Sequence, residues 1–429
     1  MHGIAEKLNE VIKDSVAARL LSSFGRRVYF PKGIVAQTAE ARKRAHKYNA
    51  TVGMAFEHGE PMLLPALSAH IRGLTAAETV AYAPTAGNPE LRRKWLEEIR
   101  AKNPSLGDAV VSTPVVTSGL TNAIAHLGDL FVDEGDTVVL PDLFWGNYRL
   151  IFQERNRAQL RTFPFFDGDG LNVAGYARAL EEAAASSAGK VVTILNFPNN
   201  PTGYTPTVAE LQGVVEALRS VAEQGASILV ICDDAYFGLF YDEASATESL
   251  FAHAADLHEN VLAAKVDGAT KEEYAWGLRV GFLTFGAKGL SADQYAALEE
   301  KLKGSIRSSI SNSSNISQSL ILKILDSPNH ESEKALAYDR LKRRFDLVRR
   351  LVEDARRPAS LRPLPFNSGY FLTFACEGID AEALRQALLD RGIGTIAVGS
   401  AYLRVAYATV EEEELEGFFT ELYETAGGM

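Results

Sequence analysis

The chain has 429 residues, of which 46% are hydrophobic and 23% are charged, proportions that are ordinary for a soluble globular protein. They exclude a disordered, collagen-like or disulfide-stapled chain, and no run of about 18 uncharged apolar residues is present to form a membrane-spanning helix. The 55 acidic and 44 basic side chains leave a net charge of −11, which disfavours nonspecific binding to nucleic acid or anionic lipid. An anionic ligand therefore needs a local basic pocket.

Cysteine and histidine usage bears on the compartment and on metals. Cys232 and Cys376 form no Cys-x-x-Cys pair and lie in apolar, strand-like segments, so we expect two buried thiols in a reducing cytoplasm. Residues 1–7 lack the apolar stretch of a secretory signal peptide, which agrees with that compartment. The eight histidines are scattered, and none is spaced for metal binding beside a cysteine or carboxylate, so we expect no metal site.

The first 45 or so residues have a helical pattern that ends in the basic run 41–47. That run is either a solvated helix face or a nucleic-acid patch, and the net negative charge favours the first. From about residue 110, short apolar segments alternate with helix-like ones, which predicts a mostly parallel sheet covered by helices on both faces. The strand-like segments are residues 115–117, 137–140, 191–195, 228–232 and 261–264, and the clearest helical ones are 122–131 and 208–223.

Residues 331–357 have the pattern of one long, charged amphipathic helix, which is a natural connector out of the sheet domain. Beyond it, strand-like segments at 370–374 and 403–406 and a helical one at 381–390 predict a smaller α+β unit. No flexible linker separates the two parts, so we expect them to pack closely across a cleft.

The predicted fold is therefore α/β, with a large domain whose mostly parallel, mixed sheet is covered by helices on both faces. The large domain is predicted to span residues 60–310. A smaller α+β domain combines residues 15–59 and 315–429, and residues 1–14 form an N-terminal arm that we expect to embrace a partner subunit.

Ligands of open α/β sheets collect beyond the carboxyl ends of the strands, and the unusual residues of this chain follow those ends. At 117–122 a strand runs through Ser118 and Gly119 into a helix, which is either an anion site made of backbone N–H groups or a plain strand-to-helix turn. The chain has no Gly-x-Gly-x-x-Gly or P-loop motif, so a dinucleotide or P-loop site lacks its signature.

Three further clusters follow strand-like segments. Residues 196–204 hold two Asn-Pro or Pro-Asn steps and a glycine, which predicts a rigid loop that presents amide side chains. Asp233 and Asp234 follow a buried strand, where a carboxylate needs a partner, and alternation points the two to opposite faces. Lys271 and Arg279 stand eight residues apart, after another strand.

Taken together, these motifs resemble a known family. Asn-Pro-Thr-Gly at 200–203, Asp-x-Ala-Tyr at 233–236 and Lys-x₇-Arg-x-Gly at 271–281, in that order, resemble the pyridoxal-phosphate (PLP) aminotransferases of fold type I, class I/II. The pattern is most similar to the aspartate/aromatic branch, and the resemblance extends over about residues 49–410. It implies PLP as the cofactor and a cytoplasmic enzyme.

The resemblance implies three catalytic residues. Lys271 forms the Schiff base with PLP and shuttles a proton between the substrate α-carbon and cofactor C4′. Asp233 pairs with the pyridine nitrogen and keeps it protonated, which makes the ring an electron sink. Tyr236, together with Asn200, hydrogen-bonds the 3′-oxygen of the ring.

The resemblance also implies a phosphate site and a stacking partner. Trp145 either stacks on the pyridine ring or is an ordinary core residue. Tyr82 reaches the phosphate of the neighbouring subunit, which implies a homodimer with shared active sites. Gly268 stands where the family often has a phosphate-binding serine, so the remaining groups carry more of the phosphate. These groups are Arg279, the backbone of Ser118, Gly119 and Leu120, and the hydroxyl of Thr121.

On the substrate side, the resemblance implies that Arg404 grips the α-carboxylate bidentately and that the Gly53 backbone and Asn200 lie against it. Arg307 matches an arginine that crosses the dimer interface to bind the distal carboxylate of dicarboxylic substrates. Because the two prolines that follow in the family are absent, a solvated arginine at a helix end stays open. Glu272 and Glu273 have no family counterpart, and facing solvent is the simplest expectation for them.

The function implied is a ping-pong aminotransferase that moves an amino group from an L-amino acid to a 2-oxo acid such as 2-oxoglutarate. Arg307 favours an aspartate- or glutamate-like donor. Aromatic and 2-aminoadipate-type aminotransferases, and a PLP lyase or decarboxylase on the same scaffold, remain alternatives. A PLP-binding regulator without activity is disfavoured because the chain keeps both Lys271 and Arg404.

Overall fold

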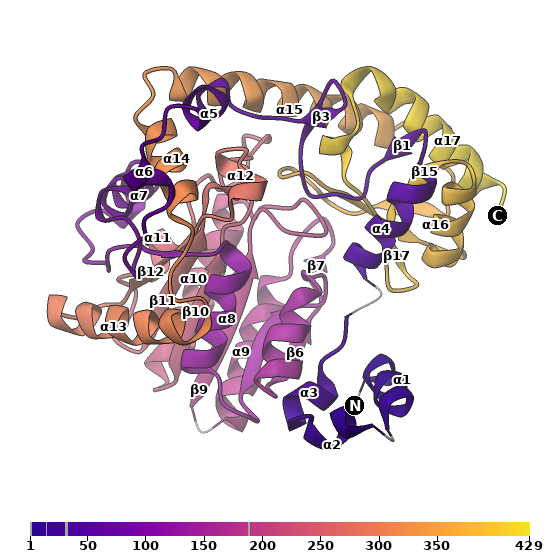
Figure 1. The fold of residues 1–429 in the computed structure, drawn as a ribbon. Coiled ribbons are helices and arrows are strands. Elements are labelled where there is room, and N and C mark those ends of the chain that lie inside the picture. The colour runs from indigo at the N-terminus through magenta and orange to yellow at the C-terminus, as the bar shows by residue number, and fades with distance from the viewer. Residues whose placement is uncertain (1, 14, 31–32, 188) are drawn as a thin grey trace.

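The computed structural model describes residues 2–13, 15–30, 33–187 and 189–429. Its centre is a seven-stranded sheet in which β12 alone runs antiparallel to its neighbours (Figure 1). The predicted mixed α/β sheet is thus confirmed, and the five strand-like segments predicted between residues 115 and 264 lie in it. Across the sheet the strands are β4 (Val115–Thr117), β12 (Gly281–Gly286), β11 (Val261–Asp267), β10 (Ser227–Asp233), β9 (Lys190–Asn196), β5 (Thr137–Pro141) and β6 (Gln159–Phe163).

Helices cover both faces of this sheet, because alternate side chains of each strand enter two separate cores. In β9, Val192 and Ile194 pack with one pair of helices, and Val191 and Leu195 pack with another pair on the opposite face. The continuous apolar strands follow from this two-sided burial. The first pair is α8 (Leu120–Phe131) and α13 (Ala292–Ser309), and the second is α9 (Val173–Ser186) and α10 (Val208–Glu223).

A smaller antiparallel sheet forms the second part of the molecule, in the order β13-β14-β17-β16. Beside this sheet, β1 (Tyr48–Asn49) pairs in parallel with β15 (Ile393–Gly394) in a separate two-stranded sheet, which joins an N-terminal segment to the C-terminal part. The other elements of this part are α4 (Ile34–Arg44), β13 (Leu361–Pro363), β14 (Leu372–Cys376), α16 (Ala381–Asp390), β16 (Ile396–Val398), β17 (Tyr402–Val405) and α17 (Leu415–Gly427).

The two parts are joined by α15 (His330–Val352), which ends five residues before the predicted helix does. Arg357 precedes Pro358, and a residue before proline is held out of the helical region. Figure 1 shows α15 running over the top of the molecule from the large sheet towards α17.

Two segments differ from the predicted division into domains. Residues 16–27, predicted in the small domain, form α2 (Val16–Leu20) and α3 (Ser23–Arg27), which pack with α1 (Gly3–Ile12) beside the large sheet. Arg27 Nε donates to the carbonyl oxygen of Glu154 at 3.2 Å, which ties this unit to the large part. Residues 315–325 form α14 (Asn315–Leu325), which packs on α5 (Pro65–Ile71) and α7 (Pro89–Lys102). The other domain boundaries stay a prediction.

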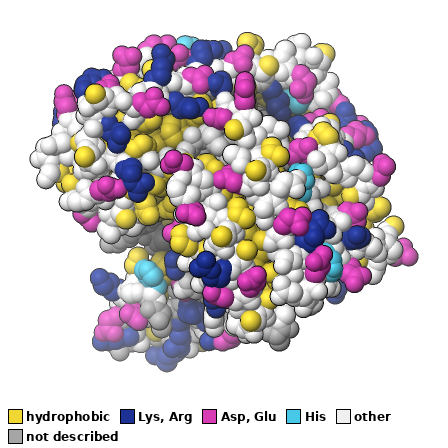
Figure 2. All heavy atoms as spheres, turned by 180° about the vertical axis from the view of Figure 1, so that it is seen from behind, with side chains coloured by type: hydrophobic (Ala, Val, Ile, Leu, Met, Phe, Trp, Pro, Cys, Tyr) yellow, Lys and Arg dark blue, Asp and Glu magenta, His cyan; other side chains and the backbone are white. Residues whose placement is uncertain are grey.

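The basic run at the end of α4 lies on the surface among acidic partners. Arg44 Nη1 is 3.1 Å from Glu40 Oε1, and Lys47 Nζ is 2.7 Å from Glu421 Oε1. On the face shown in Figure 2, acidic and basic side chains are interspersed. Over the described residues, no helix is both long and apolar enough to span a membrane.

One ion pair lies inside the large core. Lys265 of β11 is buried and contacts the carboxylate of Asp234, while Asp267 Oδ2 lies 3.4 Å from its ammonium. Burial alone lowers the pKa of Lys265, but these two carboxylates outweigh it and raise that pKa, so the ammonium stays charged. Ser249 Oγ also donates to Asp234 at 2.6 Å. Asp234 therefore has a structural partner of its own.

This pair predicts a large stability effect at Asp234. Asp234→Ala leaves Lys265 buried without its nearest counter-charge, and we expect the free energy of unfolding to fall by about 3–5 kcal/mol, measured by urea denaturation. The control is Glu377→Ala, which breaks the exposed Arg362–Glu377 pair and should cost less than about 1 kcal/mol. Equal losses in the two variants would contradict a buried, charged Lys265.

Candidate active site

The predicted residues Asp233, Lys271 and Arg279 meet at a cavity of about 180 Å³ beyond the carboxyl ends of the central parallel strands. Asp233 and Asn196 are the last residues of β10 and β9 and lie opposite each other in register. The α12 turn (Ala269–Glu272), which carries Lys271, begins two residues after β11 ends. Residues lining the cavity are Leu120, Thr121, Trp145, Asn196, Asn200, Asp233, Ala235, Tyr236, Thr270, Lys271 and Arg279.

Asp233 forms the floor of the cavity. Its Oδ1 accepts from the backbone N–H of Ala235 at 3.1 Å, and its Oδ2 accepts a hydrogen bond from the Tyr148 hydroxyl. Burial raises the pKa of Asp233 to about 6, against the opposing effects of the Tyr148 hydrogen bond and of Lys271. The carboxylate is therefore poised to gain from a cationic partner in the cavity.

Tyr148 is a site residue that the sequence does not reveal. It lies three residues after Trp145, and the two rings pack edge to face with centroids 5.5 Å apart. The buried phenol has Asp233 as its hydrogen-bond partner. Within an aromatic-rich segment, nothing in the sequence separates this tyrosine from a core residue.

Lys271 is half-buried and its ammonium lies 4.6 Å from the centroid of the Tyr236 ring. Burial lowers the pKa of Lys271 to about 8; Arg279 acts in the same direction, and Asp233 opposes both. An amine with this pKa is partly neutral near pH 7, as a nucleophile or a base must be. Thr270 lines the same cavity, and its buried Oγ1 has no hydrogen-bond partner within the described residues.

Close backbone packing builds the end of the cavity near Arg279. A Cβ at Gly119 would lie 2.4 Å from Arg279 Nη2, and Gly119 has a φ of 79°. A Cβ at Gly268 would lie 2.6 Å from the Val280 carbonyl oxygen, and one at Gly281 would lie 2.7 Å from the Gly119 carbonyl carbon. The missing serine at 268 thus has a steric reason, because no side chain fits there.

The helix start beside Arg279 supplies donors for an anion. The Ser118 N–H donates to Asn122 Oδ1 at 3.1 Å and the Gly119 N–H to the Thr117 carbonyl at 2.8 Å, so both are used within the chain. Leu120 and Thr121 are the first residues of α8, and their N–H groups have no acceptor inside the helix. These two donors and the Arg279 guanidinium suit a phosphate group.

Arg404 of β17 marks the other end of the site and is only 1% exposed. Its Nη1 donates to Asn200 Oδ1 at 3.0 Å and its Nη2 to the Thr51 carbonyl at 2.7 Å, and the guanidinium lies 4.4 Å from the Phe371 ring centroid. Burial lowers the pKa of Arg404 to about 10, and no carboxylate pairs with it within the described residues. A buried arginine without a counter-charge is suited to an anionic ligand.

Gly53 lies between the two ends. A Cβ there would be 3.1 Å from Tyr236 Oη and 3.4 Å from Phe371. The backbone at Gly53 therefore lies close to Tyr236, which follows β10, and to Phe371, which precedes β14, and its place beside the substrate stays a prediction.

Four predicted residues are placed differently from the rest. Tyr82 is 92% exposed and Arg307 is exposed on the last turn of α13, so neither lines the cavity of its own chain. Glu272 and Glu273 do not face solvent, contrary to expectation: Glu273 is 0% exposed, and the Glu272 carboxylate is 2.5 Å from Lys102 Nζ. Glu272 pairs with Lys102, and Glu273 contacts His330 and Lys334, all of which lie at least 57 residues away in the sequence.

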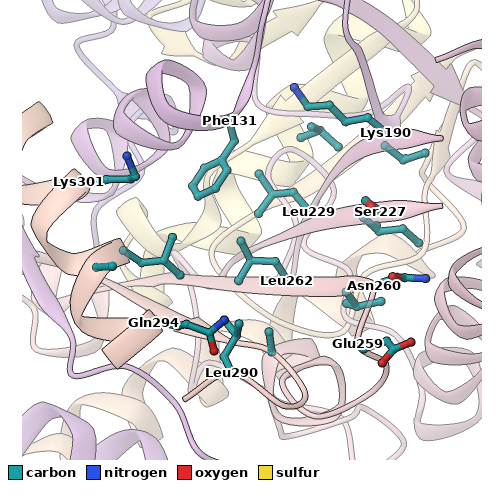
Figure 3. A pocket seen from close by; sticks show the side chains of 17 residues that line it. Phe131, Lys190, Ser227, Leu229, Glu259, Asn260, Leu262, Leu290, Gln294 and Lys301 are labelled. Atoms are coloured by element: carbon teal, nitrogen blue, oxygen red, sulfur yellow. The ribbon is translucent and has the colours of Figure 1, made fainter. Parts of the chain in front are cut away.

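A larger cavity, of about 570 Å³, lies at the opposite edge of the sheet, where β9, β10 and β11 begin. Phe131, Leu229 and Leu262 line it, with Lys190 and Lys301 at its margins (Figure 3). Lys190 is already paired, 2.5 Å from Asp136. Its wall is mostly aliphatic, with Lys190, Glu259 and Lys301 as its charged residues, whereas Asp233, Lys271 and Arg279 line the smaller cavity, which is therefore the candidate active site.

Comparison with known proteins agrees with this geometry. The model of the family aminotransferase class I and II matches residues 54–422. The chain belongs to the class I and II aminotransferase family. This aminotransferase is therefore a PLP-dependent enzyme of fold type I. Among the described residues, no group of three His, Cys, Asp or Glu side chains could hold a metal ion.

This aminotransferase is similar in sequence and in fold to several known proteins of the family. It is 27% identical over 409 residues to a probable aspartate/prephenate aminotransferase of Aquifex aeolicus, covering 90% of this chain and 94% of that one. It is 27% identical to the aspartate/prephenate aminotransferase of Thermus thermophilus, over 80% of this chain and 82% of that one. An aminotransferase structure from Anaerococcus prevotii has a TM-score of 0.83 at 24% identity, covering 93% and 98% of the two chains. That likeness shows the shared fold.

The lowered pKa of Lys271 predicts how the protein without cofactor takes up PLP. Only the neutral amine attacks an aldehyde, so the rate of covalent PLP binding should rise as pH increases through about 8 and then level off, well below the ordinary lysine value of about 10.5. Visible absorbance after PLP addition measures this rate.

The control is Lys271→Ala, which should lose the covalent component at every pH. A rate that kept rising up to pH 10 would contradict the lowered pKa, and an unchanged covalent component in Lys271→Ala would contradict the choice of lysine.

Proposed function

We propose that this aminotransferase moves the amino group of an aspartate- or glutamate-like L-amino acid to a 2-oxo acid such as 2-oxoglutarate by a ping-pong mechanism. The observation that carries the proposal is that Lys271 and Asp233 line one cavity, while the buried Arg404, which has no carboxylate partner among the described residues, donates to Asn200 of the same cavity. The relatives named aspartate/prephenate aminotransferase support the choice of substrate class.

The cavity residues fit PLP, because they supply an anion-binding end and a buried acid at its floor. When bound, PLP supplies an electron sink for negative charge that develops at the substrate α-carbon. In this proposal Asp233 holds the pyridine nitrogen, and its raised pKa favours sharing a proton there. The other holding residues are Asn200 and Tyr236 at the 3′-oxygen, Trp145 at the ring face, and Arg279 with Leu120 and Thr121 at the phosphate.

Lys271 is proposed as the proton carrier. Its partly neutral amine would take the proton from the substrate α-carbon and deliver it to C4′ of the cofactor. Tyr236 lies under the Lys271 ammonium and keeps it near the cavity floor. The half-buried position of Lys271 limits water at the reacting atoms, which strengthens every charge interaction there.

At the substrate end, Arg404 is proposed to bind the α-carboxylate. Its guanidinium is fixed by Asn200, by the Thr51 carbonyl and by stacking on Phe371. A planar donor pair held in this way orients a carboxylate bidentately and thereby aims the α-carbon at Lys271.

A homodimer with shared sites completes the proposal. Tyr82 and Arg307 are exposed away from the cavity of their own chain, and apolar side chains are exposed in the same segments. An exposed apolar surface of this kind is typical of a protein interface. The exposed apolar residues are Leu63, Ile71, Val80, Ile310 and Ile316.

A cytoplasmic location is also part of the proposal. Both thiols, Cys232 and Cys376, are free, and burial raises the pKa of each. Unreactive free thiols suit a reducing compartment.

A donor panel tests the substrate class and separates the two arginines. Arg307→Ala should lower kcat/KM for aspartate and glutamate by about 30- to several-thousand-fold, because removing one partner of a desolvated ion pair costs about 2–5 kcal/mol. Aromatic and aliphatic donors should change little. Arg404→Ala should impair every donor, because all carry the α-carboxylate. The measurement is production of the matching 2-oxo acid with 2-oxoglutarate as acceptor.

Intact aspartate turnover in Arg307→Ala would contradict the dicarboxylate assignment and leave the aminotransferase assignment standing. Preference of the wild type for an aromatic donor would shift the substrate class to the aromatic branch.

Mixed dimers test whether Arg307 serves the partner subunit. In a hybrid of Lys271→Ala and Arg307→Ala subunits, one site carries both changes and the other carries neither. Random mixing of the two inactive variants in equal amounts should restore about a quarter of wild-type activity on aspartate. Half of the dimers are then hybrids, and each hybrid has one intact site of two.

The matched control mixes Lys271→Ala with Arg404→Ala, which should restore nothing because both residues act within one chain. No recovery in the first mixture, or recovery in the second, would contradict the shared-site dimer.

A further inference from the structure

Glu273 is a fully buried acid that lies two residues after Lys271 and takes no part in the chemistry proposed above. Its Oε2 is 2.6 Å from His330 Nε2 and its Oε1 is 2.8 Å from Lys334 Nζ. Both partners lie at the start of α15. Each oxygen of the carboxylate is therefore bound to that one helix.

The charge of Glu273 is matched locally. Burial raises the pKa of Glu273, but Lys334, His330 and Lys102 together outweigh it and lower that pKa to about 2. The carboxylate is thus ionised at any working pH. The neighbouring Glu272 is held from the other side, because its Oε1 is 2.5 Å from Lys102 Nζ at the end of α7.

The turn that carries Lys271 needs such anchors. The α12 helix spans only Ala269–Glu272, and a single helical turn is not stable by itself, because nucleation costs more than its few hydrogen bonds return. Only a few backbone bonds close it: the N–H groups of Glu273, Tyr274 and Ala275 donate to the carbonyls of Ala269, Lys271 and Thr270 at 3.1, 3.2 and 3.2 Å, respectively. The position of Lys271 over Tyr236 therefore depends on the side-chain contacts made by Glu273 at the end of this turn.

The helix α15, which binds Glu273, also contacts the segment that follows Arg404. Further along α15, Arg344 Nη1 donates to the Ala408 carbonyl at 2.7 Å and its Nη2 is 2.6 Å from Glu411 Oε2. Ala408 follows β17, the strand that carries Arg404, by three residues. One helix thus contacts the Lys271 turn near its start and the segment after Arg404 near its middle (Figure 1).

We propose that Glu273 is a positioning residue that fixes the Lys271 turn to α15 through His330 and Lys334. Because α15 also holds the segment after Arg404, the tether sets the placement of Lys271 relative to the substrate carboxylate. This inference rests on the proposed roles of Lys271 and Arg404. It explains why an acid stands at 273 although nothing in the cofactor cavity uses it.

The test compares Glu273→Gln with Glu331→Gln in the PLP-loaded enzyme. Glu331 lies 3.3 Å from the other nitrogen of His330, but its side chain is 85% exposed, so its loss leaves the tether intact. Glu273→Gln should still bind PLP, as seen in its visible spectrum. Its kcat should fall by up to about 100-fold with KM nearly unchanged, because a misplaced base affects the reacting geometry more than binding. Glu331→Gln should behave like wild type.

Hydrogen exchange gives a readout that does not depend on activity. In Glu273→Gln, amides of residues 269–275 and of the start of α15 should exchange faster, while those of β10 and β11 should not change. If Glu273→Gln does not fold, Lys334→Met replaces it, since it removes one of the two contacts at a partly exposed position.

Wild-type kcat together with unchanged exchange at 269–275 would overturn the positioning role. A lower melting temperature with wild-type kcat would overturn it too, because it would show a structural pair only. A wild type that binds PLP but transaminates no donor would refute the proposed function instead, and the exchange experiment would still decide whether the tether exists.

Discussion

A buried charge needs an opposite charge or hydrogen-bond partners nearby. This constraint distinguishes the buried charges that stabilise the fold from those of the candidate active site. Lys265 is matched inside the core by Asp234 and Asp267, and Glu273 is matched by His330 and Lys334. Arg404 is equally buried and is held only by neutral groups. The chain thus matches the charges that hold it together and, among the described residues, leaves the buried Arg404 guanidinium without an acidic partner.

Sequence patterns predicted the centre of the fold and of the site because both rest on local chemistry. The five apolar strands are continuous because both sheet faces are buried, and Asp233 and Lys271 follow strand ends that parallel pairing brings together. Two strands of the large sheet were missed: β6 is a partly exposed edge strand without a continuous apolar run, and β12 has a threonine within its apolar run and a glycine at each end.

What sequence reasoning missed in the site depends on contacts between distant segments. Tyr148 reaches Asp233 across 85 positions, and Glu273 reaches His330 across 57. The packing of residues 16–27 beside the large sheet likewise rests on a contact between Arg27 and Glu154. No spacing rule marks such partners, since each residue type has an ordinary alternative as core or surface.

The glycines at 119, 268 and 281 have a consequence for how this protein can diverge. Their backbones lie so close that a methyl group at any one would collide with main-chain atoms or with Arg279. A single mutation there cannot be absorbed by a side-chain movement alone, because for Gly268 and Gly281 the atoms in the way belong to the main chain. Substitutions should therefore be tolerated least at the end of the cavity near Arg279 and more readily at positions where side chains line the cavity.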